Sequence, residues 1–152
     1  MGNLCIIKMD QTHIESIVKI EKQCFVDPWS RAGFEEELEN ENAYFIVALL
    51  DKKVCGYAGM YHICGEAYIA NIAVLPEFRG QNIGKSLLEN LILNAQLNNC
   101  EFISLEVRKT NFVAICLYKR LGFKEVGVRK EFYQNPKEDA FIMTKYFKTK
   151  EK

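Results

Sequence analysis

The residues best suited to do chemistry in this sequence follow an apolar segment that runs from residue 68 to 75. The loop that comes next contains Arg79, Gly80, Gln81, Asn82, Ile83 and Gly84, and an amphipathic run follows it. Backbone N–H groups in the first turn of a helix lack partners within the helix, and the helix dipole adds positive potential there. A strand, a small-residue loop and a helix start can therefore bind phosphate, with Arg79 and Lys85 adding positive charge.

Two familiar phosphate loops differ from this one. The Walker loop requires a Gly-Lys-Ser or Gly-Lys-Thr triplet after four spacer residues, and the dinucleotide motif has the spacing G-x-G-x-x-G. Judged by spacing alone, residues 79–84 could also be a simple tight turn into a helix, because short glycine-bearing loops are common.

A second candidate is Glu106, near the C-terminal end of a predicted strand over residues 101–107. Alternation places Leu105 and Val107 on one face of this strand and Glu106 on the other. Open α/β sheets bind ligands beyond the carboxyl ends of their strands, so this carboxylate could accept a proton from a bound amine. It could instead be a rim charge paired with Arg108 or a nearby lysine.

A third candidate is Tyr118, in a predicted helix over residues 112–121 that Asn111 can cap and Gly122 can end. Asn111 lies seven residues before Tyr118, so the two side chains fall on nearly the same side of the helix. A phenol in this place could protonate a departing thiolate. The pattern is equally consistent with a core tyrosine whose hydroxyl reaches the surface.

The run NIAVLPEFRGQNIGKSLL, residues 71–88, resembles the acetyl-CoA-binding motif Q/R-x-x-G-x-G/A of the GCN5-related N-acetyltransferase (GNAT) superfamily. Arg79 and Gly84 match this motif, whereas Asn82 stands where its first glycine would be. Asparagine is the next most suitable residue for left-handed backbone, so we expect the loop to persist with looser phosphate packing. The segments LEVRKTNFVAICLYKRLGF, RKEFYQNPKEDAFIM and DPWS are similar to the RimI-type branch, the ribosomal-protein-alanine N-acetyltransferases.

The resemblance implies an α/β (α+β) GNAT fold: a mixed, mostly antiparallel twisted sheet with helices on both faces. Its central parallel pair, strands 68–75 and 101–107, would be splayed to hold acetyl-CoA. The resemblance assigns Glu106 as base and Tyr118 as acid. It assigns acetyl-CoA contacts to Asn111, to the strand residues Ile72, Ala73 and Val74, and to Arg79, Gly80, Gln81, Asn82, Ile83, Gly84 and Lys85. The implied acceptor is a protein N-terminus, by family analogy the alanine of a small-subunit ribosomal protein.

Several weaker signals have ordinary explanations beside the functional ones. Trp29 and Tyr133 could contact the peptide substrate, or they could be structural aromatic residues. Acidic residues on the second predicted helix and just after it could attract a basic substrate or form a solvated face; they are Glu35, Glu36, Glu37, Glu39 and Glu41. His62 and Cys64 alternate on one strand but lack further ligands, so we expect no metal.

Composition sets the remaining expectations. The 152 residues carry 20 acidic and 20 basic side chains, so no overall field favours nucleic acid or an anionic membrane. Six cysteines are scattered without CxxC spacing, which indicates buried reduced thiols in a cytoplasmic protein. No leader is apparent, and no apolar stretch approaches ~18 residues, so we expect neither export nor membrane spanning. We expect one domain, residues 1–152, that is a monomer or weak dimer.

Hydrophobic periodicity and turn residues predict the order of elements. The predicted strands are 3–9, 43–50, 54–63, 68–75, 101–107, 123–132 and 140–147, and the predicted helices are 10–24, 31–39, 84–98 and 112–121. Two other functions stay open at this point. One is acetylation of another protein N-terminus or of a small amine, and the other is a catalytically silent acyl-CoA-binding module.

Overall fold

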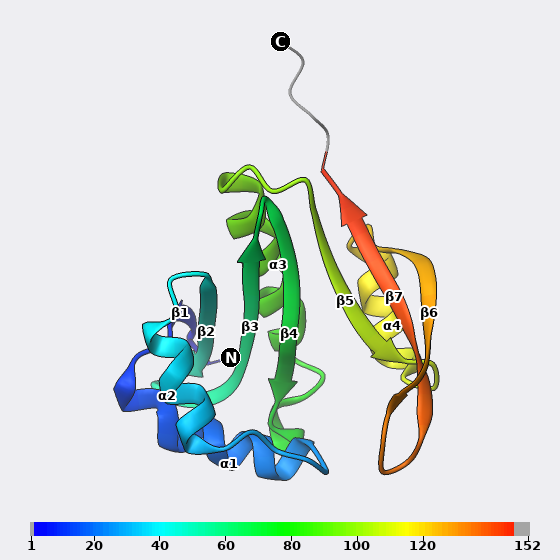
Figure 1. Ribbon diagram of the computed structural model, residues 1–152. Helices are drawn as coiled ribbons and strands as arrows, with labels where there is room; N and C mark the ends of the chain where they lie inside the picture. The colour runs from blue at the N-terminus through cyan, green and yellow to red at the C-terminus, as the bar shows by residue number, and fades with distance from the viewer. Residues whose placement is uncertain (1, 148–152) are drawn as a thin grey trace. The chain divides into compact units, whose positions relative to one another are not determined.

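The computed structural model describes residues 2–147, and Figure 1 labels its helices and strands. The order of elements is the predicted one, with short 3-10 helices at 11–13 and 76–78 in addition. The strands are β1 (Leu4–Lys8), β2 (Ala43–Leu50), β3 (Lys53–Ile63), β4 (Glu66–Val74), β5 (Phe102–Arg108), β6 (Lys124–Tyr133) and β7 (Glu138–Tyr146). The α-helices are α1 (Ile14–Cys24), α2 (Arg31–Glu39), α3 (Ile83–Leu97) and α4 (Phe112–Arg120).

The strands form a mixed sheet in the order β1-β2-β3-β4-β5-β7-β6. The pairs β1/β2, β2/β3, β5/β7 and β6/β7 are antiparallel. Strand β4 pairs with β5 in parallel, with Ala67 opposite Ile103 and Tyr68 opposite Ser104. Helix α3 connects these two strands, as a parallel connection requires. The predicted mostly antiparallel sheet with one parallel pair is therefore confirmed.

The chain forms two compact units. Among the described residues, the first comprises 2–61 and 70–93, and the second comprises 62–69 and 94–147. The last residues of β3 and α3 and the first residues of β4 therefore belong to the second unit. The rest of these three elements belongs to the first unit.

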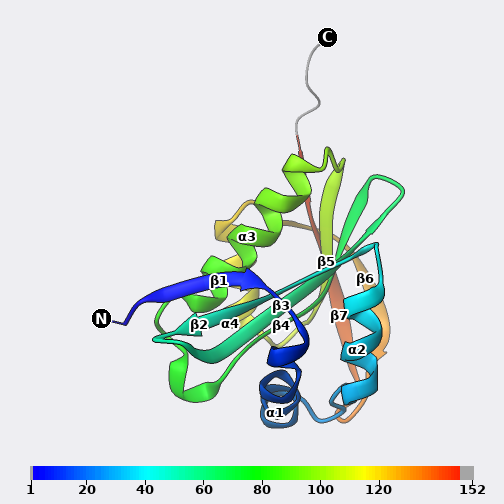
Figure 2. The ribbon, with the colours of Figure 1, turned by 90° about the vertical axis from the view of Figure 1, so that its left-hand side faces the viewer.

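In the first unit, α1 and α2 lie on one face of strands β2 to β4 and α3 lies on the other (Figures 1 and 2). Local sequence explains where the helices begin. Asp10 and His13 form a capping box before α1, and the Ser30 hydroxyl accepts a hydrogen bond from the Gly33 N–H at the start of α2. The apolar stripe of α1 then packs into a core whose fully buried members include Ile14, Ile17, Ile20, Phe34 and Tyr57.

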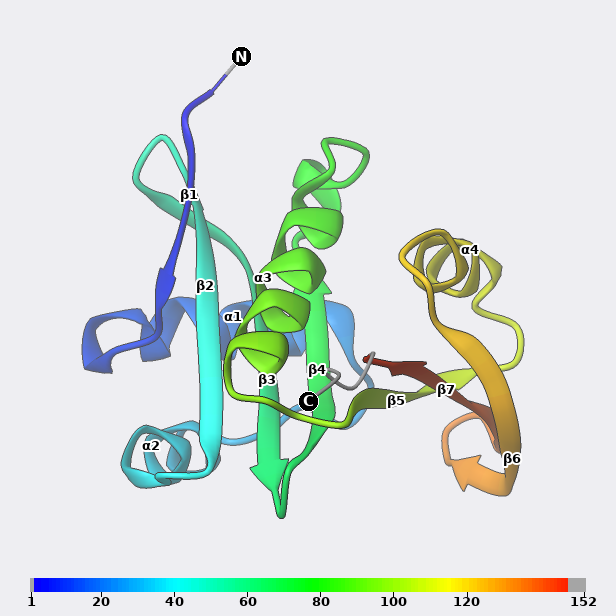
Figure 3. The same ribbon diagram turned by 90° about the horizontal axis from the view of Figure 1, so that it is seen from above.

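In the second unit, α4 covers one face of the β5, β7 and β6 group (Figure 3). The Asn111 side chain accepts a hydrogen bond from the Ala114 N–H, 3.3 Å away, so the predicted cap of α4 is confirmed. Gly122 follows the helix with φ of +97°, the left-handed end that the sequence predicts. Phe123 is then buried beside Tyr118, with ring centres 5.8 Å apart.

The expectation for the cysteines is only partly right. All six are free thiols, but Cys5, Cys64 and Cys116 are exposed, and only Cys55 and Cys100 are fully buried. The prediction failed because an apolar run also contains the outward positions of an edge strand or an amphipathic helix. None of the helices among the described residues has the length and apolar character that crossing a bilayer requires.

Candidate active site

The predicted phosphate loop lies between a short 3-10 turn and α3. Gly80 and Asn82 both have left-handed backbone, with φ of +82° and +62°. The Ser86 N–H donates to the Asn82 carbonyl, 3.0 Å away, so the N–H groups of residues 83–85 precede the first helical hydrogen bond. A Cβ added at Gly80 would meet no atom within 4 Å, which leaves its backbone accessible. These features suit a diphosphate at the start of α3.

Asn82 shows why the motif glycine can be replaced at this position. Its φ of +62° lies in the left-handed region that glycine adopts freely and that asparagine tolerates better than most other residues. The turn into α3 therefore forms without the glycine. The expected looser phosphate packing is a matter of affinity and stays a prediction.

Arg79 is held in place by its own unit. Its Nε donates to the Val74 carbonyl at 3.1 Å, and its Nη2 donates to the Cys24 sulfur at 3.6 Å. The guanidinium therefore fastens the end of β4 to the end of α1 at the entrance of the loop. Lys85 is exposed in the first turn of α3, where its charge stays available.

The strand residues predicted to contact acetyl-CoA lie at the end of β4. Ala73 is buried, and Ile72 and Val74 are half-buried. A Cβ at Gly56 of β3 would come within 2.8 Å of the Ala73 carbonyl oxygen, so only glycine lets the two strands approach this closely. Because Gly56 sits there, the path of β4 depends on a residue of the neighbouring strand.

Trp29 also belongs to the first unit. Its ring packs against Phe34 and Phe45, with centre distances of 5.4 and 6.1 Å, and the residue is half-buried. Its backbone N–H donates to the Glu21 carboxylate at 2.9 Å. This tryptophan therefore has a packing role in the first unit, and its contact with a peptide substrate stays a prediction.

Glu106 lies in the second unit, where its side chain is 27% exposed. Its Oε1 is 3.9 Å from Nε of Arg129 on β6. The alternative pairing with Arg108 is wrong, because the Arg108 guanidinium binds Glu138 at 3.2 Å. Alternation puts both side chains on one face of β5, but Arg108 is the last residue of the strand and reaches the β6–β7 turn instead.

Tyr133 is electrostatically linked to Glu106 on one side and to Tyr118 on the other. Burial, followed by the Glu106 charge, raises the pKa of Tyr133 to about 12, while Arg108 opposes the change. Burial and then Tyr133 raise the pKa of Tyr118 to about 12. Both phenols are therefore protonated at neutral pH, and the second unit brings a carboxylate and two proton donors together. Asn111 is exposed at the start of α4, where its side-chain oxygen is engaged as the helix cap.

The chain was compared with known proteins. The model of the acetyltransferase (GNAT) family matches residues 14–123. The chain belongs to this family. A ribosomal protein bS18-alanine N-acetyltransferase of Escherichia coli (strain K12) is 32% identical over 140 residues, which cover 91% of this chain and 94% of the relative. A Bacillus subtilis (strain 168) protein, provisionally given the same activity, is 37% identical over 131 residues, covering 86% and 87%.

Solved structures agree with the family assignment. The crystal structure of the ribosomal-protein-S18-alanine N-acetyltransferase from Escherichia coli matches with a TM-score of 0.90 at 30% identity. The match covers 98% of this chain and 97% of that one. The predicted GNAT fold and acyltransferase activity are therefore confirmed, while the roles of individual residues stay predictions.

Two residues of this GNAT domain were missed as functional candidates. Glu21 lies on the buried stripe of α1 and accepts hydrogen bonds from three groups of the first unit. A carboxylate among apolar positions of a helix was the available signal. Arg108 was noticed only as a partner for Glu106, and no sequence pattern indicates its contacts with the β6–β7 turn.

Proposed function

We propose that this GNAT enzyme transfers the acetyl group of acetyl-CoA to the α-amine of a protein N-terminus. The first candidate acceptor is the N-terminal alanine of the ribosomal protein bS18. Near full-length similarity to enzymes named for that reaction supports the proposal. That similarity carries the proposal, and the placement of Glu106 on β5 and of Tyr118 on α4, both in the second unit, is consistent with it.

Residues of the first unit would bind most of acetyl-CoA. Its diphosphate would accept hydrogen bonds from the loop 79–84 and from the first turn of α3, with Lys85 adding charge. Residues 72–74 would bind its pantetheine arm through their backbone, in the manner of an added strand. By resemblance to the family, Asn111 is also a proposed acetyl-CoA contact, and it caps α4. Acetyl-CoA supplies an acetyl thioester that is already activated toward amines.

The residues proposed for catalysis move two protons. The Glu106 carboxylate would accept a proton from the attacking amine, directly or through one water. The Tyr118 phenol would donate its proton to the sulfur of the departing CoA, whose free thiol has a reference pKa of about 8.5. Because the pKa of Tyr118 is about 12, this phenol carries its proton throughout the physiological range.

An α-amine suits this site better than a lysine side chain. Reference pKa values are about 7.7–8.0 for an α-amine and about 10.4 for lysine. A large share of α-amines is therefore neutral at pH 7.5, whereas lysine is almost fully protonated. A carboxylate base is adequate for the first acceptor and poor for the second.

The test uses the purified protein, acetyl-CoA and synthetic peptides that differ only at residues one to four. Release of free CoA is followed with a thiol reagent, and mass spectrometry locates the acetyl group. We expect peptide-dependent CoA release and acetylation of the α-amine of peptides beginning with alanine. A peptide with a blocked N-terminus and an internal lysine is the matched control. CoA release that is equal with the blocked peptide would contradict the proposal.

A further inference from the structure

The Glu21 carboxylate is the most deeply buried charged group among residues 2–147, with the residue only 1% exposed. Its Oε1 accepts a hydrogen bond from the Trp29 N–H at 2.9 Å. Its Oε2 accepts from the Tyr57 hydroxyl and, at 3.2 Å, from the Asn71 side-chain amide. Asn71 also donates to the Tyr57 oxygen at 2.9 Å. Both oxygens of the carboxylate thus accept hydrogen bonds from donors of the first unit.

These bonds join three separate parts of the first unit. Trp29 lies in the loop 25–30 between α1 and α2, Tyr57 lies on β3, and Asn71 lies on β4. Pro28 has no backbone N–H, so the Trp29 N–H is the donor through which this end of the loop reaches α1. Asn71 directly precedes the strand residues 72–74 that we propose for acetyl-CoA.

Burying the carboxylate of Glu21 costs free energy, because a charged group must be removed from water. Burial raises the pKa of Glu21, although its hydrogen bonds with Trp29 and Tyr57 act in the opposite direction. An apolar residue of similar size would fill the same place in the α1 stripe without the cost of removing a charge from water. The value of the glutamate therefore lies in the geometry that it specifies.

We propose that Glu21 is a positioning residue that fixes the loop 25–30 against β3 and β4 and so holds Trp29 for the peptide substrate. This inference rests on the proposed function. It assigns Glu21 no contact with the reacting atoms.

A carboxylate suits this network because both sides donate to it, the Trp29 N–H on one side and the Tyr57 and Asn71 groups on the other. Each oxygen of a carboxylate accepts hydrogen bonds, whereas a glutamine has one oxygen and one NH₂ group. In Glu21→Gln, the amide oxygen can serve either Trp29 or Asn71, and the NH₂ group then faces a donor on the other side. In Glu21→Met, neither side keeps an acceptor. The loop should therefore loosen in Glu21→Gln and more strongly in Glu21→Met.

The first test does not depend on catalysis. Trp29 is the sole tryptophan of the chain, so intrinsic fluorescence reports on this loop alone. We expect a red-shifted emission and stronger acrylamide quenching in Glu21→Met, with a smaller change in Glu21→Gln. The control is Tyr44→Phe, which removes another tyrosine hydrogen bond in the first unit, 2.8 Å from Asn90. Tyr44→Phe should keep the wild-type emission, and wild-type emission in both Glu21 variants would overturn the inference.

The second test compares the KM for the peptide with the KM for acetyl-CoA. We expect Glu21→Met to raise KM for the peptide about ten-fold, with kcat and the KM for acetyl-CoA within about two-fold of wild type. Glu21→Gln should lie between wild type and Glu21→Met. An unchanged peptide KM in the presence of altered fluorescence, or an equal rise in both KM values, would overturn the positioning role.

These experiments distinguish a variant that does not fold, or a protein that lacks the proposed activity, from a failure of the positioning role. Circular dichroism and a thermal melt establish that each variant is folded at the assay temperature. Should Glu21→Met fail to fold, Glu21→Gln gives both measurements. Should wild-type protein release no CoA with any peptide, the proposed function fails, while the fluorescence result still decides whether Glu21 orders the loop.

Discussion

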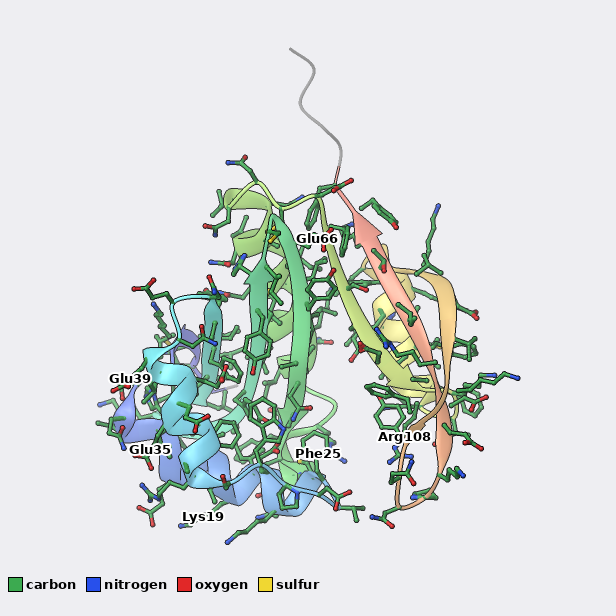
Figure 4. All side chains as sticks on the ribbon, viewed as in Figure 1. Lys19, Phe25, Glu35, Glu39, Glu66 and Arg108 are labelled. Carbon is green, nitrogen blue, oxygen red and sulfur yellow. The ribbon has the colours of Figure 1, made fainter. Side chains whose placement is uncertain are left out.

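The guanidinium of Arg108 lies 4.4 Å from the centre of the Tyr133 ring. The same group donates to the carbonyls of Pro136 and Gln134, at 2.9 and 3.1 Å, and binds Glu138. One side chain from the end of β5, labelled in Figure 4, thus holds both the β6–β7 turn and a tyrosine proposed for the peptide. A planar guanidinium can do this because it stacks and donates in several directions at once.

Arg108→Gln should loosen this turn and weaken peptide binding. The variant loses the stacking on Tyr133 and the charge-assisted bond to Glu138, so we expect the peptide KM to rise about ten-fold. The KM for acetyl-CoA should change less than two-fold. Arg120→Gln, which removes a positive charge from the last turn of α4, is the control. Equal peptide KM values for the two variants would show that the turn has no part in binding.

Glu106→Gln should remove the proposed base. An amide cannot accept the proton of the attacking amine, so we expect kcat/KM to fall by about 100-fold or more. The control is Glu125→Gln on β6, which removes an exposed carboxylate. The measurement is CoA release at saturating acetyl-CoA from pH 6 to 9. Near-normal kcat/KM across that range would exclude Glu106 as the base.

Tyr118→Phe tests the proposed acid and its pH dependence. We expect kcat to fall about ten-fold or more, with acetyl-CoA affinity largely retained. A phenol donates only below its pKa, so a pKa of about 12 predicts that wild-type activity shows no loss from Tyr118 up to pH 10. Tyr146→Phe, at a tyrosine that is 64% exposed, is the control. Full turnover by Tyr118→Phe would remove this residue from the mechanism.

Features set by neighbouring residues could be predicted from the sequence. The cap Asn111 and the left-handed Gly122 each act within a few residues, and the structure has both as expected. The parallel pair also followed from the pattern, because a helix separates its two strands.

Partners that lie far apart in the chain could not be predicted in this way. Glu21 is 36 residues from Tyr57 and 50 from Asn71. Glu106 pairs with Arg129 of β6 rather than with its near neighbour Arg108. Such pairs depend on strand register and on which face of a helix meets the sheet, and no short motif encodes either. The solvated interpretation of the acidic α2 face is right for Glu35 and Glu39, which are exposed and labelled in Figure 4. It is wrong for Glu37, which is half-buried, with one carboxylate oxygen buried and without a hydrogen-bond partner among the described residues.

Two glycines beside the proposed acetyl-CoA site should respond to alanine in opposite ways. At Gly56 the new Cβ would lie 2.8 Å from the Ala73 carbonyl oxygen, so β3 and β4 must move apart. We expect Gly56→Ala to destabilise the protein by about 1–3 kcal/mol, as other overpacked sites do, and to raise the KM for acetyl-CoA because β4 carries residues 72–74. At Gly84 the nearest atom, Val74 Cγ2, would be 3.8 Å away, which is an ordinary contact.

Gly84→Ala should therefore stabilise the protein by up to about 1 kcal/mol, because alanine has the higher helix propensity. Thermal or urea unfolding of the two variants beside wild type measures both changes. The contrast isolates the close approach of β3 to β4 from the general effect of adding a methyl group near the loop. Equal destabilisation by both substitutions would mean that the first turn of α3, rather than the contact between Gly56 and Ala73, limits the space at this site.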